Sequence, residues 1–78
     1  MSNNSHTTTI NVSGMTCSHC VSSVTEELTA LKGVQNVAIN LNAGGISEVT
    51  ITSTLTLDPA EIGEAVAEAG YLVVSNNA

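Results

Sequence analysis

Alternating apolar and polar positions predict four short β-strands along the chain. In the first three, every second side chain is aliphatic, as expected for a strand with one buried face and one exposed face. Two glycines in the turn at residues 42–45 separate the second strand from the third and favour a hairpin there. The predicted strands span residues 8–13, 34–41, 47–54 and 71–75.

Two other segments follow the helical period. The first predicts a helix over residues 18–32, with Gly33 as a left-handed C-cap. The second has a strong start signal, because Asp58 is a good N-cap and Pro59 suits the first helical position. Glu61 then completes a pattern that resembles a capping box. The apolar stripes are Val21, Val24, Leu28 and Leu31 in the first helix, and Ile62, Ala65, Val66 and Ala69 in the second.

The predicted order of elements, β-α-β-β-α-β, points to one fold class. The simplest packing is a four-stranded antiparallel sheet with both helices on one face, an α+β sandwich of ferredoxin-like topology. Residues 8–75 are expected to form a single domain, residues 1–7 a disordered tail and residues 76–78 a C-terminal tail. The chain has 78 residues and contains neither Phe nor Trp, so the expected core is thin and aliphatic.

The charge balance excludes several classes of partner. The formal net charge is −6, and Lys32 is the only Lys or Arg. Because nucleic-acid affinity depends on cations that meet phosphates, we expect no nucleic-acid partner. Anionic membranes are disfavoured for the same reason, and no apolar run approaches the roughly 20 residues of a membrane-spanning helix. The N-terminus lacks the basic and apolar regions of a signal peptide, so the expected location is cytoplasmic.

Two cysteines provide the candidate chemistry. Cys17 and Cys20 fall where a strand ends and a helix begins, so the first-turn amides and the helix dipole favour thiolates. Structural zinc needs four ligands and would require both His6 and His19, and iron–sulfur clusters usually need four thiolates. Cu(I) accepts two soft thiolates, which the chain itself provides. His6 belongs to the predicted tail. His19 is expected to project outward, with an accessory ligand or a proton donor as the alternative role.

Residues 14–20, Gly-Met-Thr-Cys-Ser-His-Cys, resemble the Gly-Met-Thr-Cys-x-x-Cys motif of the heavy-metal-associated domain family. The resemblance covers about residues 8–75 and is strengthened by the pair Gly70 and Tyr71 near the end of the chain. This family includes small copper chaperones and the N-terminal domains of copper-transporting P-type ATPases. Among these, the chain resembles a bacterial copper chaperone.

The resemblance implies a role for each residue around the motif. Cys17 and Cys20 correspond to the two metal ligands, and Met15 corresponds to a methionine that packs inward and is not a ligand. Thr16 stands where zinc and cadmium relatives often have Asp. A hard carboxylate at this position helps zinc, so Thr in its place favours Cu(I). Tyr71 corresponds to the aromatic residue that bacterial members place near the metal.

The function implied by the resemblance is that of a Cu(I) metallochaperone without enzymatic turnover. Such a protein passes copper by thiolate exchange to a copper-transporting P-type ATPase or to its metal-binding domains. A copper-bridged homodimer is also plausible, because two loops together supply four thiolates. One alternative is a metal-binding domain of a larger copper ATPase. Another is a thiol–disulfide oxidoreductase, but that class requires a proline facing the motif, whereas the only proline, Pro59, begins the second helix.

Two surface features complete the sequence-based expectations. Many chaperones of the family carry several lysines on the first helix as a docking face, whereas the corresponding surface positions here carry none, so docking should use a different charge pattern. On the last strand, Leu72 and Val74 are expected to face outward as a small apolar patch. The surface positions of the first helix that carry no lysine are Ser22, Ser23, Thr25, Glu26 and Glu27.

Overall fold

The computed structural model describes residues 5–16 and 18–77 of the chain. Over these residues, strands and helices follow in the predicted order. The helices comprise 12 and 10 residues, and within the described part of the chain no helix is long and apolar enough to cross a membrane. The elements are β1 (His6–Ser13), α1 (Ser18–Thr29), β2 (Val34–Asn40), β3 (Ile46–Ser53), α2 (Pro59–Glu68) and β4 (Leu72–Asn77).

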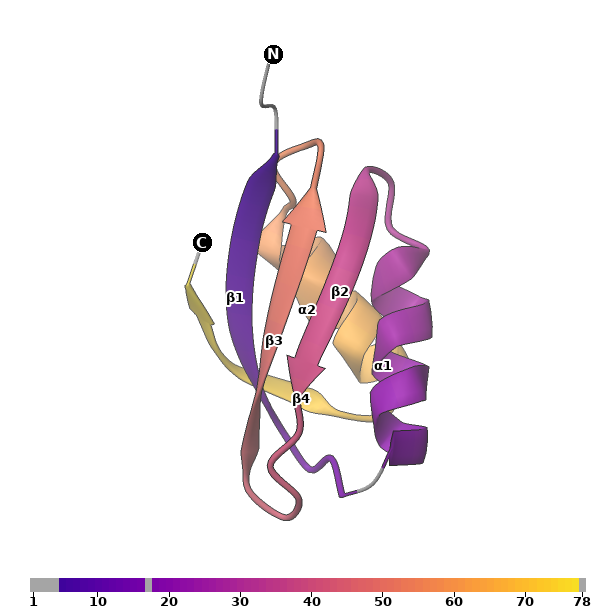
Figure 1. The fold of residues 1–78 in the computed structure, drawn as a ribbon, viewed down its shortest axis with the longest axis vertical. Coiled ribbons are helices and arrows are strands. Elements are labelled where there is room, and N and C mark those ends of the chain that lie inside the picture. Colours follow the sequence, from indigo (N-terminus) through magenta and orange to yellow (C-terminus); the bar gives the residue numbers. More distant parts are fainter. Residues whose placement is uncertain (1–4, 17, 78) are drawn as a thin grey trace.

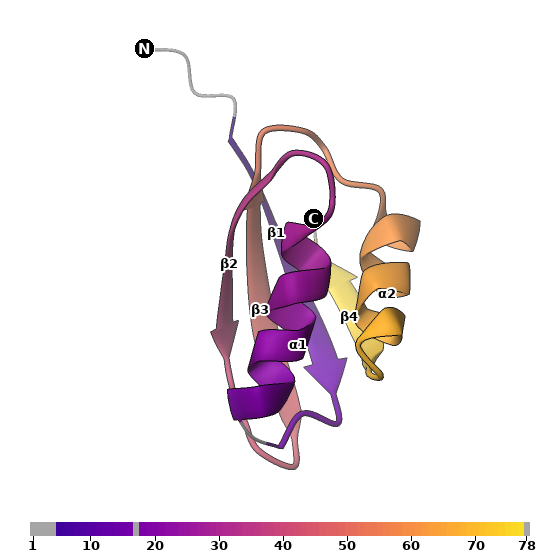
Figure 2. The same cartoon turned by 90° about the vertical axis from the view of Figure 1, so that its right-hand side faces the viewer.

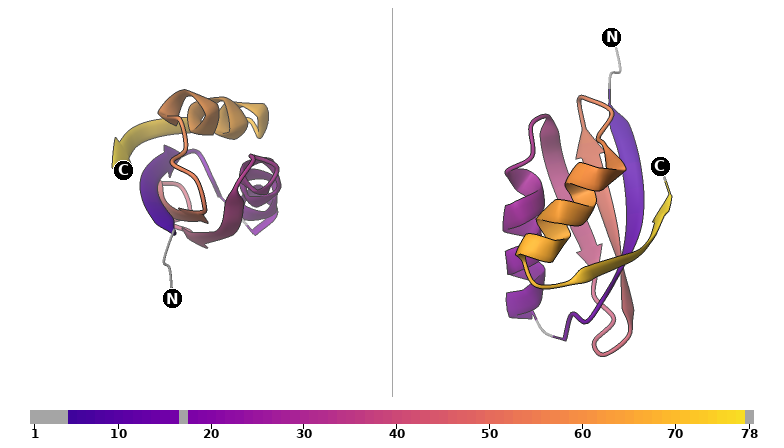
Figure 3. Two further views of the ribbon diagram at one scale, coloured as in Figure 1. Left: turned by 90° about the horizontal axis from the view of Figure 1, so that it is seen from above. Right: turned by 180° about the vertical axis from the view of Figure 1, so that it is seen from behind.

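The strands form one antiparallel sheet in the order β2-β3-β1-β4, which places β1 and β3 at its centre. Both helices lie on the same face of this sheet, and the opposite face is open (Figure 1 and Figure 2). Seen from behind, α2 crosses the sheet obliquely and α1 lies along its β2 side, while β1 remains in view (Figure 3). The ferredoxin-like α+β arrangement predicted from the order of elements is therefore confirmed.

The core lies between the central strands and the helices. Ile10 and Val12 of β1 and Val49 and Ile51 of β3 are fully buried, while the residues between them lie on the open face. Burying an aliphatic side chain of this size contributes roughly 1.5–3 kcal/mol relative to leaving it exposed. The core is aliphatic, as the composition predicted. The helices add four side chains that are also fully buried: Val24, Leu28, Ile62 and Val66.

The strands at both ends of the chain are longer than predicted. β1 begins at His6 instead of residue 8, because His6 and Thr7 pair with Ser53 and Thr52 of β3. β4 continues to Asn77 because its last residues pair with the middle of β1. Residues that the sequence assigned to tails thus belong to the sheet, since a neighbouring strand offers partners for their backbone groups. Residues 1–4 and 78 lie outside the described residues.

Helix α1 ends at Thr29, earlier than the end predicted at Lys32. After it, Leu31 donates its N–H to the carbonyl oxygen of Leu28 at 3.1 Å, which is the tighter bond of a closing turn. Gly33 then adopts the predicted left-handed conformation with φ +91°. Leu31 still packs against the core, so the apolar stripe extends beyond the regular helix. Side-chain periodicity located the buried face correctly but overestimated the helix length.

The open face of the sheet carries exposed apolar side chains at one end. Leu72 and Val74 are 68% and 50% exposed, as the alternation in β4 predicted, and Ile46 of β3 is 54% exposed. Ser13 pairs with Ile46 on one side and with Leu72 on the other, so these three residues form a row across three strands. The row lies where β1 ends and the following loop begins.

The predicted N-cap of α2 generates a test of stability. Asp58 has an extended backbone, and its carboxylate accepts a hydrogen bond from the N–H of Ala60 at 2.9 Å. Replacing Asp58 with Ala removes this bond and should lower the free energy of unfolding by about 1 kcal/mol in urea denaturation. The exposed neighbour Thr56, replaced with Ala, is the control and should change stability by less than about 0.5 kcal/mol. Equal effects of the two substitutions would contradict the capping role.

Candidate metal centre

The loop that follows β1 is bent by a glycine. Gly14 has φ +96°, a backbone conformation that residues with a side chain rarely adopt. The space at Gly14 is also limited, because a Cβ atom added there would lie 3.4 Å from Cδ1 of Tyr71. Gly14 therefore turns the chain out of the sheet and lets it pass close to the tyrosine ring.

Met15 anchors the base of the loop. Its side chain is fully buried and belongs to the core cluster. Its carbonyl oxygen accepts a hydrogen bond from the N–H of Gly44, in the turn between β2 and β3, at 3.2 Å. Burial of the side chain leaves Met15 no access to a metal ion at the surface, so the loop is fixed here, and the next residue, Thr16, is exposed.

Cys20 lies in the first turn of α1. The side chain is half-buried and packs against the core, and its Sγ lies 3.8 Å from Oγ1 of Thr16. When Cys20 is a thiolate, only the Thr16 hydroxyl can donate in this contact, so the contact favours the metal-binding form. The N-terminus of the helix acts in the same direction, because its dipole stabilises negative charge. Cys17, the other predicted ligand, lies outside the described residues.

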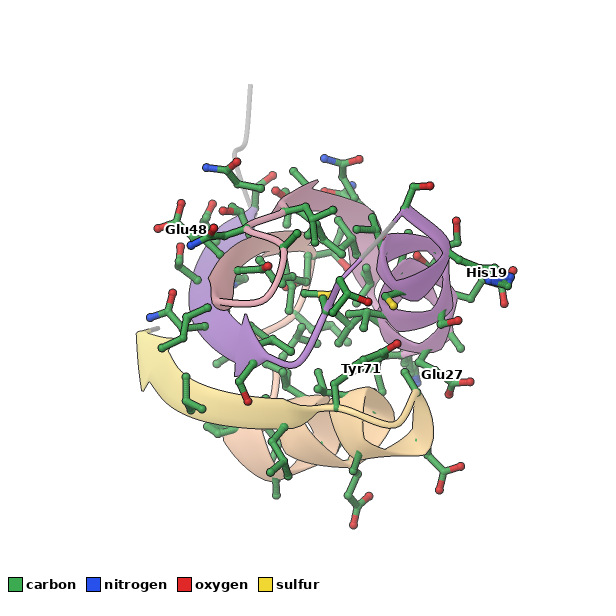
Figure 4. The ribbon with its side chains drawn as sticks, turned by 90° about the horizontal axis from the view of Figure 1, so that it is seen from below. His19, Glu27, Glu48 and Tyr71 are labelled. Atoms are coloured by element: carbon green, nitrogen blue, oxygen red, sulfur yellow. The ribbon has the colours of Figure 1, made fainter. Side chains whose placement is uncertain are left out.

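Tyr71 is held beside the loop by the end of α2. Gly70 has φ +98°, and the N–H of Tyr71 donates to the carbonyl oxygen of Val66 at 3.1 Å. Together with a bond from Gly70 to Ala67, this is the Schellman arrangement that commonly ends helices. Figure 4, which views the molecule from the loop end, shows Tyr71 reaching from the α2–β4 connection toward α1. The half-buried ring thus borders the loop on the side of α2.

The two histidines occupy different environments. His19 is exposed and points outward from α1, on the side away from Tyr71 (Figure 4). His6 begins β1, whereas the loop follows its last residue. With a rise of about 3.3 Å per residue, the 8 residues of this strand place His6 roughly 25 Å from the loop. His6 therefore cannot share a metal with Cys20.

Comparison with known proteins identifies the family of this arrangement. A family model for the heavy-metal-associated domain matches residues 9–71, a range that contains the cysteine loop and ends at Tyr71. The chain belongs to this family. The copper chaperone CopZ of Staphylococcus aureus is 34% identical over 65 residues, which cover 83% of this chain and 93% of that protein.

Two further proteins of very different length are similar to this chain. A solved CopZ metallochaperone superposes with a TM-score of 0.76 at 30% identity, covering 88% of this chain and all of that one. Human copper-transporting ATPase 2 is 31% identical over 65 residues, or 83% of this chain. The chain spans only 4% of the length of that ATPase. Domains of this type thus occur both as small chaperones and as parts of much larger transporters.

The structure also brings together glutamates that lie far apart in the sequence. A groove of about 600 Å³ lies between α1 and α2 of this heavy-metal-associated domain, with Leu31 and three alanines among its lining residues. Glu27 of α1 joins it from one side, although it lies more than 30 residues from the glutamates of α2. No local pattern in the sequence indicates this grouping, because only the packing of the two helices creates it. The acidic residues of the groove are Glu27, Glu61, Glu64 and Glu68.

The conformation of Gly14 generates a second test. Replacing Gly14 with Ala introduces a side chain at positive φ next to Tyr71, and it should destabilise the domain by about 1 kcal/mol or more. Gly63 is the matched control, because it lies inside α2 with no atom within 4 Å of an added Cβ. Gly63→Ala should stabilise the domain by roughly 0.5–1 kcal/mol. Thermal and urea denaturation of both variants measure these effects, and a Gly14→Ala protein as stable as wild type would contradict the assigned constraint.

Proposed function

We propose that this domain binds one Cu(I) ion between Cys17 and Cys20 and delivers it to another protein. The observation that carries the proposal is the position of Cys20. The half-buried Cys20 lies in the first turn of α1 with its Sγ beside the Thr16 hydroxyl, and the loop that precedes the helix has its base fixed by the buried Met15. The similarity to proteins named copper chaperone supports the choice of metal.

The number of available ligands favours Cu(I) over zinc. The chain has two cysteines, and His6 is too distant to add a ligand. His19 points away from the side of α1 that Tyr71 borders. Structural zinc sites usually have four ligands, whereas soft thiolates suit Cu(I) at low coordination number. Thr16 offers a hydroxyl in place of the harder carboxylate of zinc-type relatives, and this difference also favours Cu(I) over zinc.

Low coordination also explains how the metal would leave. A thiolate of the acceptor protein forms a third bond to Cu(I), and a bond to one cysteine of this domain then breaks. Copper keeps its oxidation state throughout, and each step exchanges one sulfur ligand for another. The order of events parallels thiol–disulfide exchange, in which attack precedes departure of the leaving group. A second copy of this loop could take the place of the acceptor, which gives the copper-bridged homodimer.

The proposed acceptor is a copper-transporting P-type ATPase or one of its metal-binding domains. The acidic groove between α1 and α2 favours an acceptor with a basic surface, because opposite potentials accelerate encounter. We place the protein in the cytoplasm, where thiols stay reduced. A chain of this kind built into a larger ATPase would perform the same capture and transfer.

Thiol–disulfide oxidoreductase chemistry is less well supported. That chemistry needs a proline opposite the cysteines, and the only proline of the chain begins α2. The start of α2 lies toward the end of the molecule opposite the loop (Figure 2). We therefore assign no enzymatic turnover to the cysteine pair.

Anaerobic titration with Cu(I) against a competing chelator tests the metal site. We expect saturation at about one ion per monomer. Cys17→Ser and Cys20→Ser should each lose affinity by more than about 100-fold, which exceeds the loss expected for residues that only support the ligands. His19→Ala, the matched control between the two cysteines, should stay within about tenfold of wild type. Wild-type affinity in Cys17→Ser, or tighter binding of zinc than of Cu(I), would overturn the proposal.

Charge reversal tests the docking surface. Glu64→Lys, in the acidic groove, should slow copper transfer to an acceptor domain with a lysine-rich helical face by roughly 3- to 10-fold at low salt, and less at high salt. Glu48→Lys makes the same change in net charge on the open face of the sheet, on the other side of the molecule (Figure 4), and should have little effect. Stopped-flow transfer rates at two ionic strengths measure the difference. Equal slowing by both substitutions would show that only overall charge matters.

A further inference from the structure

The hydrogen bond between Gly44 and Met15 continues the pairing of β1 with β3 beyond the end of the sheet. Ser13 is the last residue of β1, and it pairs with Ile46, the first residue of β3. Met15 lies two residues after Ser13, and Gly44 lies two residues before Ile46. The same register therefore places Met15 opposite Gly44, and these two residues form the bond. The register is thus preserved across the kink at Gly14. The base of the metal loop and the β2–β3 turn therefore form one connected unit.

The β2–β3 turn is itself held in place from the interior. The backbone N–H of Asn42 donates to Oγ of Ser47 at 2.9 Å, and Ser47 is fully buried. The N–H of Gly45 donates to the carbonyl oxygen of Asn42 at 2.9 Å, which closes the turn. Gly44, between these contacts, has φ +77°. The turn is consequently a fixed support and not a loose loop whose donor reaches Met15 by chance.

We infer that the β2–β3 turn is a positioning element for the metal loop and that Gly44 is its key residue. The inference rests on the proposed function, since it concerns the same cysteine loop. The bonded carbonyl group belongs to the peptide that joins Met15 to Thr16, and Thr16 directly precedes Cys17 in the sequence. Holding that peptide limits the directions in which the loop can leave the sheet. Figure 1 shows the loop and the turn next to each other at one end of the molecule.

Affinity for the metal depends on this support in a simple way. Only loop conformations that bring both thiolates to one point can capture Cu(I), and apparent affinity falls in proportion to the fraction of the protein in such conformations. Loss of the bond from Gly44 widens the range of loop conformations and lowers that fraction. The turn therefore contributes to binding without touching the metal.

Glycine is required at position 44 by its backbone and not by lack of space. No atom lies within 4 Å of a Cβ added there, but a positive φ is strained for Ala. Asn tolerates this region better than other residues with a side chain. Gly44→Ala should therefore weaken the support that the turn gives to the metal loop, whereas Gly44→Asn should largely preserve that support.

Two measurements on the full chain test the inference. In the metal-free protein, the Gly44 amide hydrogen should exchange with solvent at least about tenfold more slowly than in an unfolded chain, because it is bonded to Met15. In competition titrations with Cu(I), Gly44→Ala should bind about five-fold more weakly than wild type, and Gly44→Asn within about two-fold of it.

Asp58→Ala is the control for a general loss of stability. It should destabilise the domain by a similar amount, yet it lies at the start of α2, toward the end of the molecule opposite the loop (Figure 2), so the affinity of this variant for Cu(I) should match wild type. Equal weakening in Gly44→Ala and Asp58→Ala, or wild-type affinity in Gly44→Ala, would overturn the inference. Exchange of the Gly44 amide at the unfolded rate would do so in the metal-free protein. If wild type failed to bind Cu(I), the proposed function would fall, while the exchange measurement would still decide whether the turn holds the loop.

Discussion

The pairing of β1 with β3 is the constraint on which the rest of the molecule depends. These strands occupy the centre of the sheet, and their register directs Ile10, Val12, Val49 and Ile51 toward the helices together. A slip by one residue would turn this whole set to the open face and remove the core. The same register, extended past the sheet, places Met15 against the β2–β3 turn. One pattern of backbone bonds therefore sets both the core and the starting point of the metal loop.

The base of the loop is fixed, and exposed residues follow it. Met15 is buried, Gly14 bends the chain and Tyr71 borders the bend, whereas Thr16 and His19 are exposed. The proposed copper transfer needs both features, because a fixed base would keep the ligands ready and exposed surroundings would admit an incoming thiolate. The left-handed glycines Gly14 and Gly70 make this possible, since each turns the chain at a point where a side chain would be strained.

The two faces of the sandwich differ in charge as well as in cover. The helical face has a groove bordered by glutamates, while Glu48 lies on the open face, whose exposed apolar residues sit near the loop. With Lys32 as the only Lys or Arg, this heavy-metal-associated domain has no lysine-rich face with which to dock. A partner chosen by electrostatics would have to present the complementary positive charge.

The amino-acid sequence was sufficient to predict the fold class, the order of elements, the caps at Asp58 and Gly33, and the motif around Cys17 and Cys20. These features are local: alternation, helical period, capping chemistry and ligand type all act over a few residues. Tertiary structure alone decided the extension of β1 to His6, the early end of α1, the meeting of Glu27 with the glutamates of α2, and the bond from Gly44 to Met15. Each of these depends on which segments pack together and in what register. Residues that are far apart in sequence give no local signal of which segments will pack together. The register between strands depends on the burial of whole faces and on the backbone partners available in the neighbouring strand.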